Sequence, residues 1–245
     1  VWTLLGGALA AGGSGALNQY IDRELDRRMQ RTAKRPMADG RLTDAEGLAF
    51  GLGMSLVSYF ILACFVNDLA ALLSLAGIAY YVILYSMWLK KATVQNIVIG
   101  GGAGAIPPMV GYAAATGHLD WTAWILFAII FMWTPPHFWA LAIVRMKDYE
   151  HAGVPMMPVV RGEMETRRQI FVYTIELVIV TLLLPILNLA GTFYLVSSLV
   201  LGGALLYAAW KVWRTGGNKL AWRMYKWSSS YHVFIFVAIM IDSVL

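Results

Sequence analysis

The chain has 245 residues, of which 59% are hydrophobic and only 13% charged, and its mean hydropathy is +0.63. Soluble domains carry about 25% charged residues, so this composition excludes an ordinary soluble protein and predicts an integral membrane protein. The net charge of +5 does not indicate a nucleic-acid partner, because the basic residues fall in loops between apolar segments.

Eight apolar segments approach the ~20 residues that a membrane helix needs. In chain order they span residues 1–21, 46–66, 69–89, 95–115, 121–145, 169–189, 192–213 and 229–245. We therefore expect an all-α, polytopic membrane helix bundle with eight transmembrane helices, forming a single domain over residues 1–245.

Lysine and arginine alternate between the loops. They crowd the loops after the first, third, fifth and seventh segments, whereas the loops near residues 67, 118 and 190 contain none. The positive-inside rule places the four basic loops on the cytoplasmic side or its equivalent, and hence the beginning of this chain outside. A bacterial plasma (inner) membrane is favoured over the mitochondrial inner membrane.

A polar ladder of Asn18, Asp22 and Asp26 ends the first apolar segment. Its four-residue spacing puts the three side chains on one helix face, about 6 Å apart along the axis. We expect exposed carboxylates there, and oxygen ligands one turn apart suit Mg²⁺ that also binds a substrate phosphate. The alternative is a ladder of ion pairs with neighbouring arginines such as Arg23.

The third segment ends in Tyr85-Ser-Met-Trp-Leu-Lys90-Lys91. These lysines either extend to the membrane interface to reach water or meet an anionic substrate on the same membrane side as the ladder.

Paired prolines interrupt two segments, at Pro107-Pro108 and at Pro135-Pro136. Proline removes helix hydrogen bonds, and broken membrane helices are tolerated where the backbone lines a cavity or packs against protein. We therefore expect two helices kinked around an interior space. His137 in that space is either a contact for a metal-bearing macrocycle or a partner in a hydrogen bond to a neighbouring helix.

The basic loop from Arg145 to Gly162 offers a further carboxylate at Asp148, followed by Tyr149. Asp148 can complete a Mg²⁺ site, while Lys147 and Arg161 neutralise diphosphate oxygens. The alternative is an ordinary basic loop without a site.

Taken together, Asn18–Pro36, Tyr85–Gly111, Trp133–Ala142 and Asp148–Glu163 resemble the UbiA-type intramembrane prenyltransferases, in particular their haem-modifying branch. The resemblance covers essentially the whole chain. It implies a nine-helix fold, so the family's first helix is expected to be missing here. It also implies farnesyl transfer from farnesyl diphosphate to haem B, giving haem O for terminal oxidases, with Mg²⁺ as cofactor and haem A synthase as a partner.

The resemblance also implies roles for individual residues. Asp22, Asp26, Asp148 and Lys90 are the expected catalytic residues, and Asn18, Asp22, Asp26 and Asp148 the expected Mg²⁺ ligands. The expected substrate-binding residues are Asn18, Arg23, Lys147, Arg161, His137 and Tyr149. One departure concerns the second aspartate motif, because the residue four positions after Asp148 is Ala152 rather than aspartate.

Two other functions compete with this one. A related prenyltransferase could act on an aromatic quinone precursor, but the Pro-Pro-His-Phe-Trp stretch argues against it. A non-catalytic, haem-handling membrane transporter would explain the kinked helices. It would not explain carboxylates and cations gathered on one membrane side, and its broken helices would fall in corresponding halves.

Overall fold

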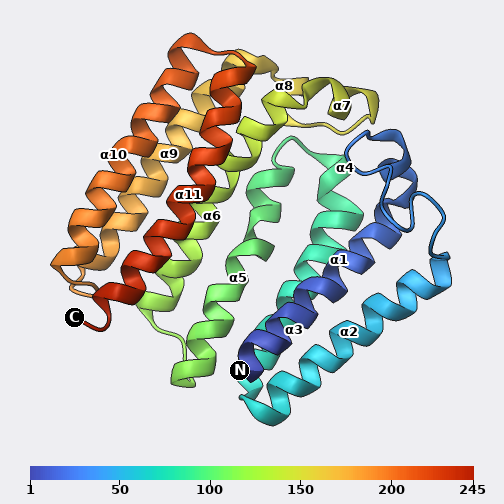
Figure 1. Ribbon diagram of the computed structural model, residues 1–245, viewed down its shortest axis with the longest axis horizontal. Helices are drawn as coiled ribbons and strands as arrows, with labels where there is room; N and C mark the ends of the chain where they lie inside the picture. The colour runs from blue at the N-terminus through green and yellow to red at the C-terminus, as the bar shows by residue number, and fades with distance from the viewer. The chain divides into compact units, whose positions relative to one another are not determined.

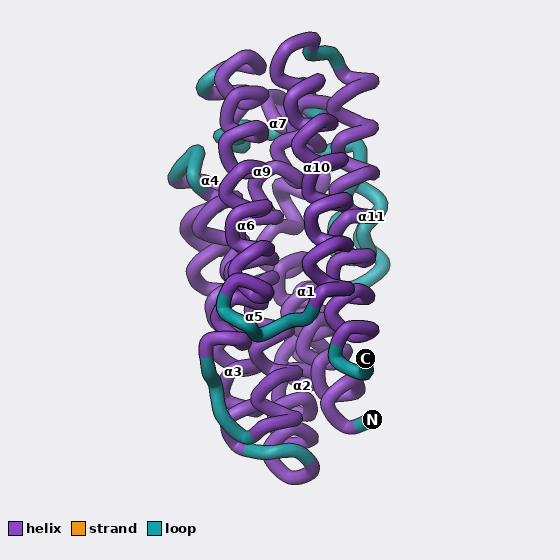
Figure 2. Tube along the Cα trace, turned by 90° about the vertical axis from the view of Figure 1, so that its left-hand side faces the viewer, coloured by secondary structure: helices purple, strands orange, loops and turns teal.

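The computed structural model describes residues 1–245 apart from the side chain of Lys91, and this part contains helices and no strand (Figures 1 and 2). The long helices are α1 (Trp2–Arg28), α2 (Asp44–Phe65), α3 (Asp68–Ala79) with its π-helical continuation η1 (Tyr80–Leu89), α5 (Asn96–Thr116), α6 (Trp121–Val144), α9 (Gly162–Ile186), α10 (Thr192–Thr215) and α11 (Asn218–Asp242). Short helices are α4 (Lys90–Ala92), α7 (Met146–His151) and α8 (Met157–Val160).

The all-α prediction is confirmed, and a long helix lies over each of the eight predicted segments of the described chain. Within that chain, six helical stretches are long and apolar enough to cross a membrane: Asp44–Phe65, Asp68–Leu89, Asn96–Thr116, Trp121–Val144, Gly162–Ile186 and Thr192–Thr215. The chain is thus an integral membrane protein. The other two long helices, α1 and α11, contain less apolar sequence.

Three predicted boundaries are wrong by more than a helical turn. The first helix continues to Arg28 instead of ending near 21, α9 begins at Gly162 instead of 169, and α11 begins at Asn218 instead of 229. All three additions are charged stretches. Hydropathy marks the part of a helix that suits lipid, whereas the backbone hydrogen bonds continue beyond it into the polar interface.

The chain forms two compact units, residues 1–123 with 147–155, and residues 124–146 with 156–245. In the first unit α1 packs against α2, α3, η1 and α5. In the second unit α10 packs against both α9 and α11 (Figure 1). The single domain over residues 1–245 stays a prediction.

Glycine brings α1 and α2 close together. A Cβ added to Gly13 would lie 2.6 Å from the Ser55 Oγ and 2.9 Å from its backbone nitrogen. Farther along, Ser58 donates to the Gly6 carbonyl oxygen at 2.7 Å. Small residues permit such close helix contacts in membranes, so the first helix is fixed by its neighbour α2.

The glycine-rich run of α5 accommodates the tyrosines of η1. A Cβ on Gly100 would lie 2.2 Å from the ring of Tyr85, and one on Gly102 would lie 2.9 Å from the hydroxyl of Tyr80. Tyr80 also donates to the carbonyl oxygen of Ile99 at 2.7 Å. The absent side chains of α5 therefore allow the wider π-helix to pack directly on it.

We expect Gly13→Ala to lower the free energy of unfolding by about 1–3 kcal/mol, because its Cβ meets a backbone that cannot move aside. Gly15→Ala is the matched control, since a Cβ there meets no atom within 4 Å. That control should leave stability unchanged or raise it by up to about 1 kcal/mol through helix propensity. Thermal unfolding in detergent measures both; equal stabilities would contradict the tight α1–α2 contact.

Candidate active site

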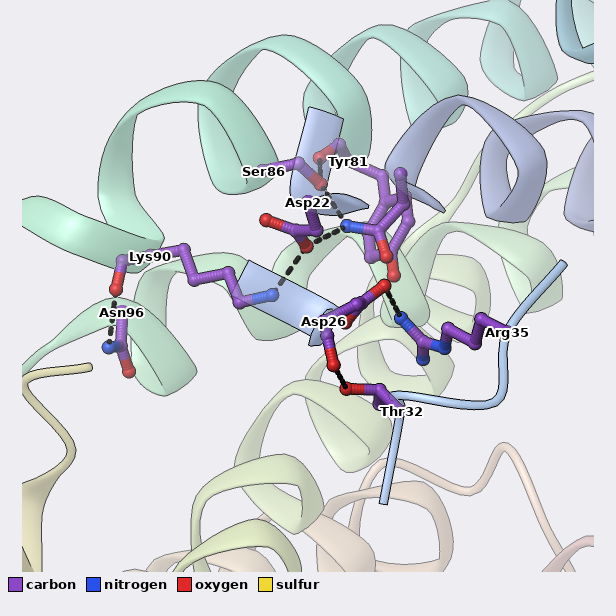
Figure 3. A network of polar contacts seen from close by, with 9 residues as sticks. Asp22, Asp26, Thr32, Arg35, Tyr81, Ser86, Lys90 and Asn96 are labelled. Carbon is purple, nitrogen blue, oxygen red and sulfur yellow. Dashed lines mark hydrogen bonds and ion pairs between the residues drawn. The ribbon is translucent and has the colours of Figure 1, made fainter. Parts of the chain in front are cut away.

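The ladder of α1 is buried. Asn18, Asp22 and Asp26 retain 6%, 0% and 2% of their exposed surface, so the expectation of exposed carboxylates at the helix end is wrong. The reason is that α1 does not end at the ladder: the π-helix η1 and the loop after α1 supply partners to these side chains (Figure 3). The prediction that all three share one helix face is consistent with their joint burial.

Asp22 is the centre of the first group of contacts. Its Oδ2 accepts a hydrogen bond from the Asn18 Nδ2 at 2.8 Å and forms an ion pair with the Lys90 ammonium (Figure 3). Asn18 Nδ2 also donates to the Ser86 Oγ at 2.8 Å, and Ser86 donates to the Tyr81 carbonyl oxygen at 2.9 Å. Asn18 and Asp22, four residues apart on α1, therefore contact Ser86 of η1 and Lys90, which begins α4 directly after η1.

The π-helix explains how Ser86 and Lys90 reach α1 together. Its hydrogen bonds run from residue i+5 to residue i, and the Lys90 N–H accordingly donates to the Tyr85 carbonyl oxygen. The wider turn changes the direction of every side chain that follows it. Single π-turns inside α-helices are frequent at functional sites, and here the π-helix leads directly to the lysine that pairs with Asp22.

Asp26 has a separate cation. Arg35, from the loop after α1, donates from Nη1 to the Asp26 Oδ2 at 2.8 Å (Figure 3). Thr32 of the same loop donates to the Asp26 backbone oxygen at 3.2 Å. Because buried charges need partners, the loop has to fold back over the end of α1 for Asp26 to be ionised there.

Three buried oxygen atoms have no hydrogen-bond partner within the described residues: Asp22 Oδ1, Asp148 Oδ2 and Asn96 Oδ1. The other carboxylate oxygen of Asp148 accepts from the Gln30 backbone N–H at 3.2 Å, and Asn96 donates from Nδ2 to the Lys90 carbonyl oxygen at 3.4 Å. Unsatisfied buried acceptors are uncommon. Carboxylate and amide oxygens are ligands for hard cations, so this donor set fits Mg²⁺.

The structure does not assemble the predicted ligands into one cage. Among the described residues no group of three or more His, Cys, Asp or Glu side chains is close enough to hold one metal ion. Mg²⁺ in phosphate-transferring sites commonly uses only one or two carboxylates and completes its shell with water and substrate phosphate. Asp22 and Asp148 therefore fit as Mg²⁺ ligands, of one shared ion or of two separate ions. In either arrangement the substrate has to supply further oxygen ligands.

The remaining predicted residues fall into three groups. Arg23 lies outside the Asp22 contacts, because it donates to the Tyr20 carbonyl oxygen at 2.6 Å and pairs with Asp44 at 2.9 Å. In α7, Lys147 is exposed, whereas Tyr149 retains 8% of its exposed surface. Arg161 and His137 belong to the second unit, where Arg161 is exposed between α8 and α9. Their functional roles stay predictions.

His137 is buried in the second unit with 6% of its surface exposed. Its ring stacks on Trp133 at 4.2 Å between centroids and on Tyr225 at 4.5 Å. Its Nδ1 lies 2.8 Å from the Ser228 Oγ of α11. The predicted hydrogen bond to a neighbouring helix is therefore present, while contact with a macrocycle stays a prediction.

No pattern in the sequence marks Ser86, Arg35 and Asn96 as residues of this site. Ser86 follows Tyr85 in a motif in which only the lysines have a predicted role. Arg35 is one of many arginines in its loop. Asn96 begins α5 with no pattern around it that indicates burial. Only the pairing of distant segments identifies these three.

An apolar cavity of about 570 Å³ lies in the first unit among α1, α3, η1 and α5. Small residues line it, including Gly7, Gly15 and Gly104, and Tyr81 contributes to its wall. Tyr81 also accepts the hydrogen bond from Ser86, so the cavity adjoins the polar contacts of Asn18. The volume falls within the range of pockets that bind small organic molecules.

Comparison with known proteins gives a consistent result. The UbiA prenyltransferase family matches residues 1–230. Over 245 residues the chain is 51% identical to the protoheme IX farnesyltransferase of Roseiflexus sp. (strain RS-1), covering 100% of this chain and 46% of that protein, about half its length. It is 49% identical over 243 residues to the protoheme IX farnesyltransferase of Gloeobacter violaceus, covering 99% of this chain and 80% of that protein.

Two solved structures share the fold at low sequence identity. A digeranylgeranylglyceryl phosphate synthase structure superposes with a TM-score of 0.82 at 18% identity, covering 99% of this chain and 85% of that chain. A UbiA homolog from Archaeoglobus fulgidus, bound to DMAPP and Mg²⁺, gives a TM-score of 0.69 at 15% identity, covering 98% of this chain and 87% of that chain.

We expect Lys90→Met to lower the free energy of unfolding by about 3–5 kcal/mol, because Asp22 would remain buried without its cation. The double variant Asp22→Asn/Lys90→Met should recover most of that loss, since it removes both charges. Lys34→Met replaces an exposed lysine of the same unit and serves as the control. Thermal unfolding in detergent tests the set; a double variant no more stable than Lys90→Met would refute the pairing argument.

Proposed function

This chain belongs to the UbiA prenyltransferase family, and we propose that it transfers a farnesyl group from farnesyl diphosphate to a vinyl group of haem B, which makes haem O. The observation that carries the proposal is the buried cluster of Asn18, Asp22 and Lys90 adjoining an apolar cavity. A prenyl diphosphate has the same two parts, a highly charged head and an apolar tail.

The names of the relatives support haem B as the acceptor. Proteins about half identical to this chain over its whole length bear the name protoheme IX farnesyltransferase. The chain spans 46% of the Roseiflexus relative, so the activity, the substrates and the partners of the whole protein are proposed here. The buried, aromatic surroundings of His137 in the second unit support a flat aromatic acceptor such as a porphyrin.

Mg²⁺ is the proposed cofactor, held by Asp22 and Asp26 of α1 and by Asp148 of α7. The partnerless oxygens of Asp22 and Asp148 support this choice, and a UbiA homolog of the same fold is bound to DMAPP and Mg²⁺. Bound beside the diphosphate, the ion would offset the negative charge that develops on the leaving group. Asn18 is proposed to contribute an amide oxygen, and the use of its Nδ2 by Asp22 and Ser86 supports this role.

In the proposed reaction the bond between C1 of the farnesyl group and the diphosphate oxygen breaks, and its electron pair leaves with diphosphate. The π electrons of the haem vinyl group form the new bond to C1. A water molecule adds to the resulting cation and loses a proton, leaving a hydroxyl group. Lys90 stabilises the departing diphosphate, and the apolar cavity keeps other water away from the allylic cation.

The site is proposed to face the cytoplasm of a bacterial cell. Lysine and arginine concentrate in the segments that follow the first, third, fifth and seventh apolar stretches, and the α1 ladder and Lys90 border the first two of these; the positive-inside rule supports a cytoplasmic side for such segments. Lys147 and Tyr149 of α7, Arg23 of α1 and Arg161 between α8 and α9 are proposed to assist substrate binding. Haem A synthase, which would take the product onward, is the proposed partner.

The direct test incubates membranes containing the protein with haem B, farnesyl diphosphate and Mg²⁺, followed by mass spectrometry of the extracted haem. We expect a new species heavier by one farnesyl group plus one hydroxyl group, and no such species after Mg²⁺ chelation. Asp148→Asn should lower the rate by about 10²–10³-fold if its carboxylate supports the leaving group.

Three results would contradict this function. Unmodified haem together with prenylation of an aromatic quinone precursor would assign the chain to another branch of the family. No transfer to either acceptor would favour a transporter. Full activity in the presence of a chelator would exclude Mg²⁺.

The cavity predicts selectivity for prenyl length. Gly7 lines it about 16 Å from Asn18 along α1, and a Cβ at Gly7 meets no atom within 4 Å. We expect Gly7→Leu to lower kcat/KM for farnesyl diphosphate about tenfold while sparing geranyl diphosphate, because lost room for a few methylenes is worth about 1–3 kcal/mol. Gly53→Leu, on the exposed side of α2, is the control. Equal losses for both substrates would show that the tail lies elsewhere.

A further inference from the structure

Two helices of the second unit are joined at Ser228. From α6, the Trp133 indole N–H donates to the Ser228 carbonyl oxygen at 2.7 Å, and the His137 Nδ1 lies 2.8 Å from the Ser228 hydroxyl. Trp133 and His137 are four residues apart, so one face of α6 presents both side chains. Ser228 retains 1% of its exposed surface, and α6 is thereby held to α11 at a single residue.

The hydroxyl of Ser228 determines which nitrogen of His137 carries the proton. Ser228 donates to the Tyr225 carbonyl oxygen at 2.9 Å, and a hydroxyl group has only one hydrogen to give. With that hydrogen donated to Tyr225, Ser228 accepts a hydrogen bond from His137, and on this basis we assign the proton to Nδ1. In a neutral imidazole the other nitrogen, Nε2, then carries the lone pair.

Nothing else in the described chain uses that lone pair. No hydrogen bond to the His137 Nε2 is formed within the described residues, and the side chain retains 6% of its exposed surface. Trp133 and Tyr225 stack on the ring at interplanar angles of 22° and 27°, so the imidazole is held rigidly. An ionisable side chain inside a membrane protein is a candidate functional residue.

We propose that the His137 Nε2 ligates the iron of the haem acceptor, and that Ser228 is the positioning residue that fixes its tautomer and ring orientation. Imidazole nitrogen is a common haem ligand. Metal-ligating histidines almost always give their other N–H to a fixed acceptor, which orients the ring and raises its basicity. The inference rests on the proposed function, because that function supplies the haem.

His232 is the nearest competitor for the same role. Its ring lies edge to face on Trp133 at 4.4 Å between centroids and stacks on Phe236 at 5.2 Å. It makes no hydrogen bond within the described residues that would fix its tautomer. His137, with its Nδ1 proton engaged, is the better prepared ligand, and His232→Ala belongs in the test.

The experiment titrates the purified protein with haem B and records the Soret band and the iron–histidine stretching band by resonance Raman spectroscopy. The unmodified protein should bind haem and show the iron–histidine band. His137→Ala should lose that band, and added imidazole should restore it. His232→Ala should keep it.

Serine variants test the positioning role. Ser228→Ala should weaken haem binding about 10–100-fold and shift the iron–histidine band, whereas Ser228→Thr should keep both near their original values by retaining the hydroxyl. Ser230→Ala is the matched control, because Ser230 donates only to Lys226 of its own helix.

The outcomes separate the two proposals. An unmodified protein that binds no haem overturns the proposed function. If the His137→Ala variant binds haem and shows the same iron–histidine band as the unmodified protein, this inference alone is overturned. Identical behaviour of Ser228→Ala and Ser230→Ala would leave no positioning role for Ser228.

Discussion

The first unit depends on keeping a carboxylate ionised inside a membrane protein. Asp22 is completely buried, and its stability as an anion rests on the Lys90 ammonium and the Asn18 amide. Lys90 directly follows the π-helix η1, and a Cβ at Gly100 would collide with the ring of Tyr85 in that helix. The ion pair, the π-helix and the glycine on the neighbouring helix are thus linked by direct contacts.

The same pair is suited to a substrate that brings both signs of charge. An anionic diphosphate competes for the Lys90 ammonium, while a divalent cation competes for the Asp22 carboxylate. A complex of the two can satisfy both partners at once, whereas either alone would leave one buried charge without a counterion. The electrostatic arrangement of α1 and η1 therefore favours the metal complex over free diphosphate.

The sequence predicts the helical class, the eight long helices and the common face of Asn18, Asp22 and Asp26, because these follow from hydropathy and from the 3.6-residue period. It does not predict the burial of that face, the cation chosen by each aspartate, or the π-helix. Arg35 is one of several arginines in its loop, and only the folded loop selects it for Asp26. Long-range pairings of this kind leave no periodic trace in a single sequence.

His137 shows why the two alternatives drawn from the sequence are compatible with each other. A buried histidine was expected either to hydrogen-bond to a neighbouring helix or to bind a macrocycle, as if one excluded the other. An imidazole has two nitrogens, and Ser228 engages only Nδ1. The hydrogen bond between Nδ1 and Ser228 orients the ring and leaves Nε2 available to a ligand. Packing between α6 and α11 and readiness for a ligand follow from the same contact.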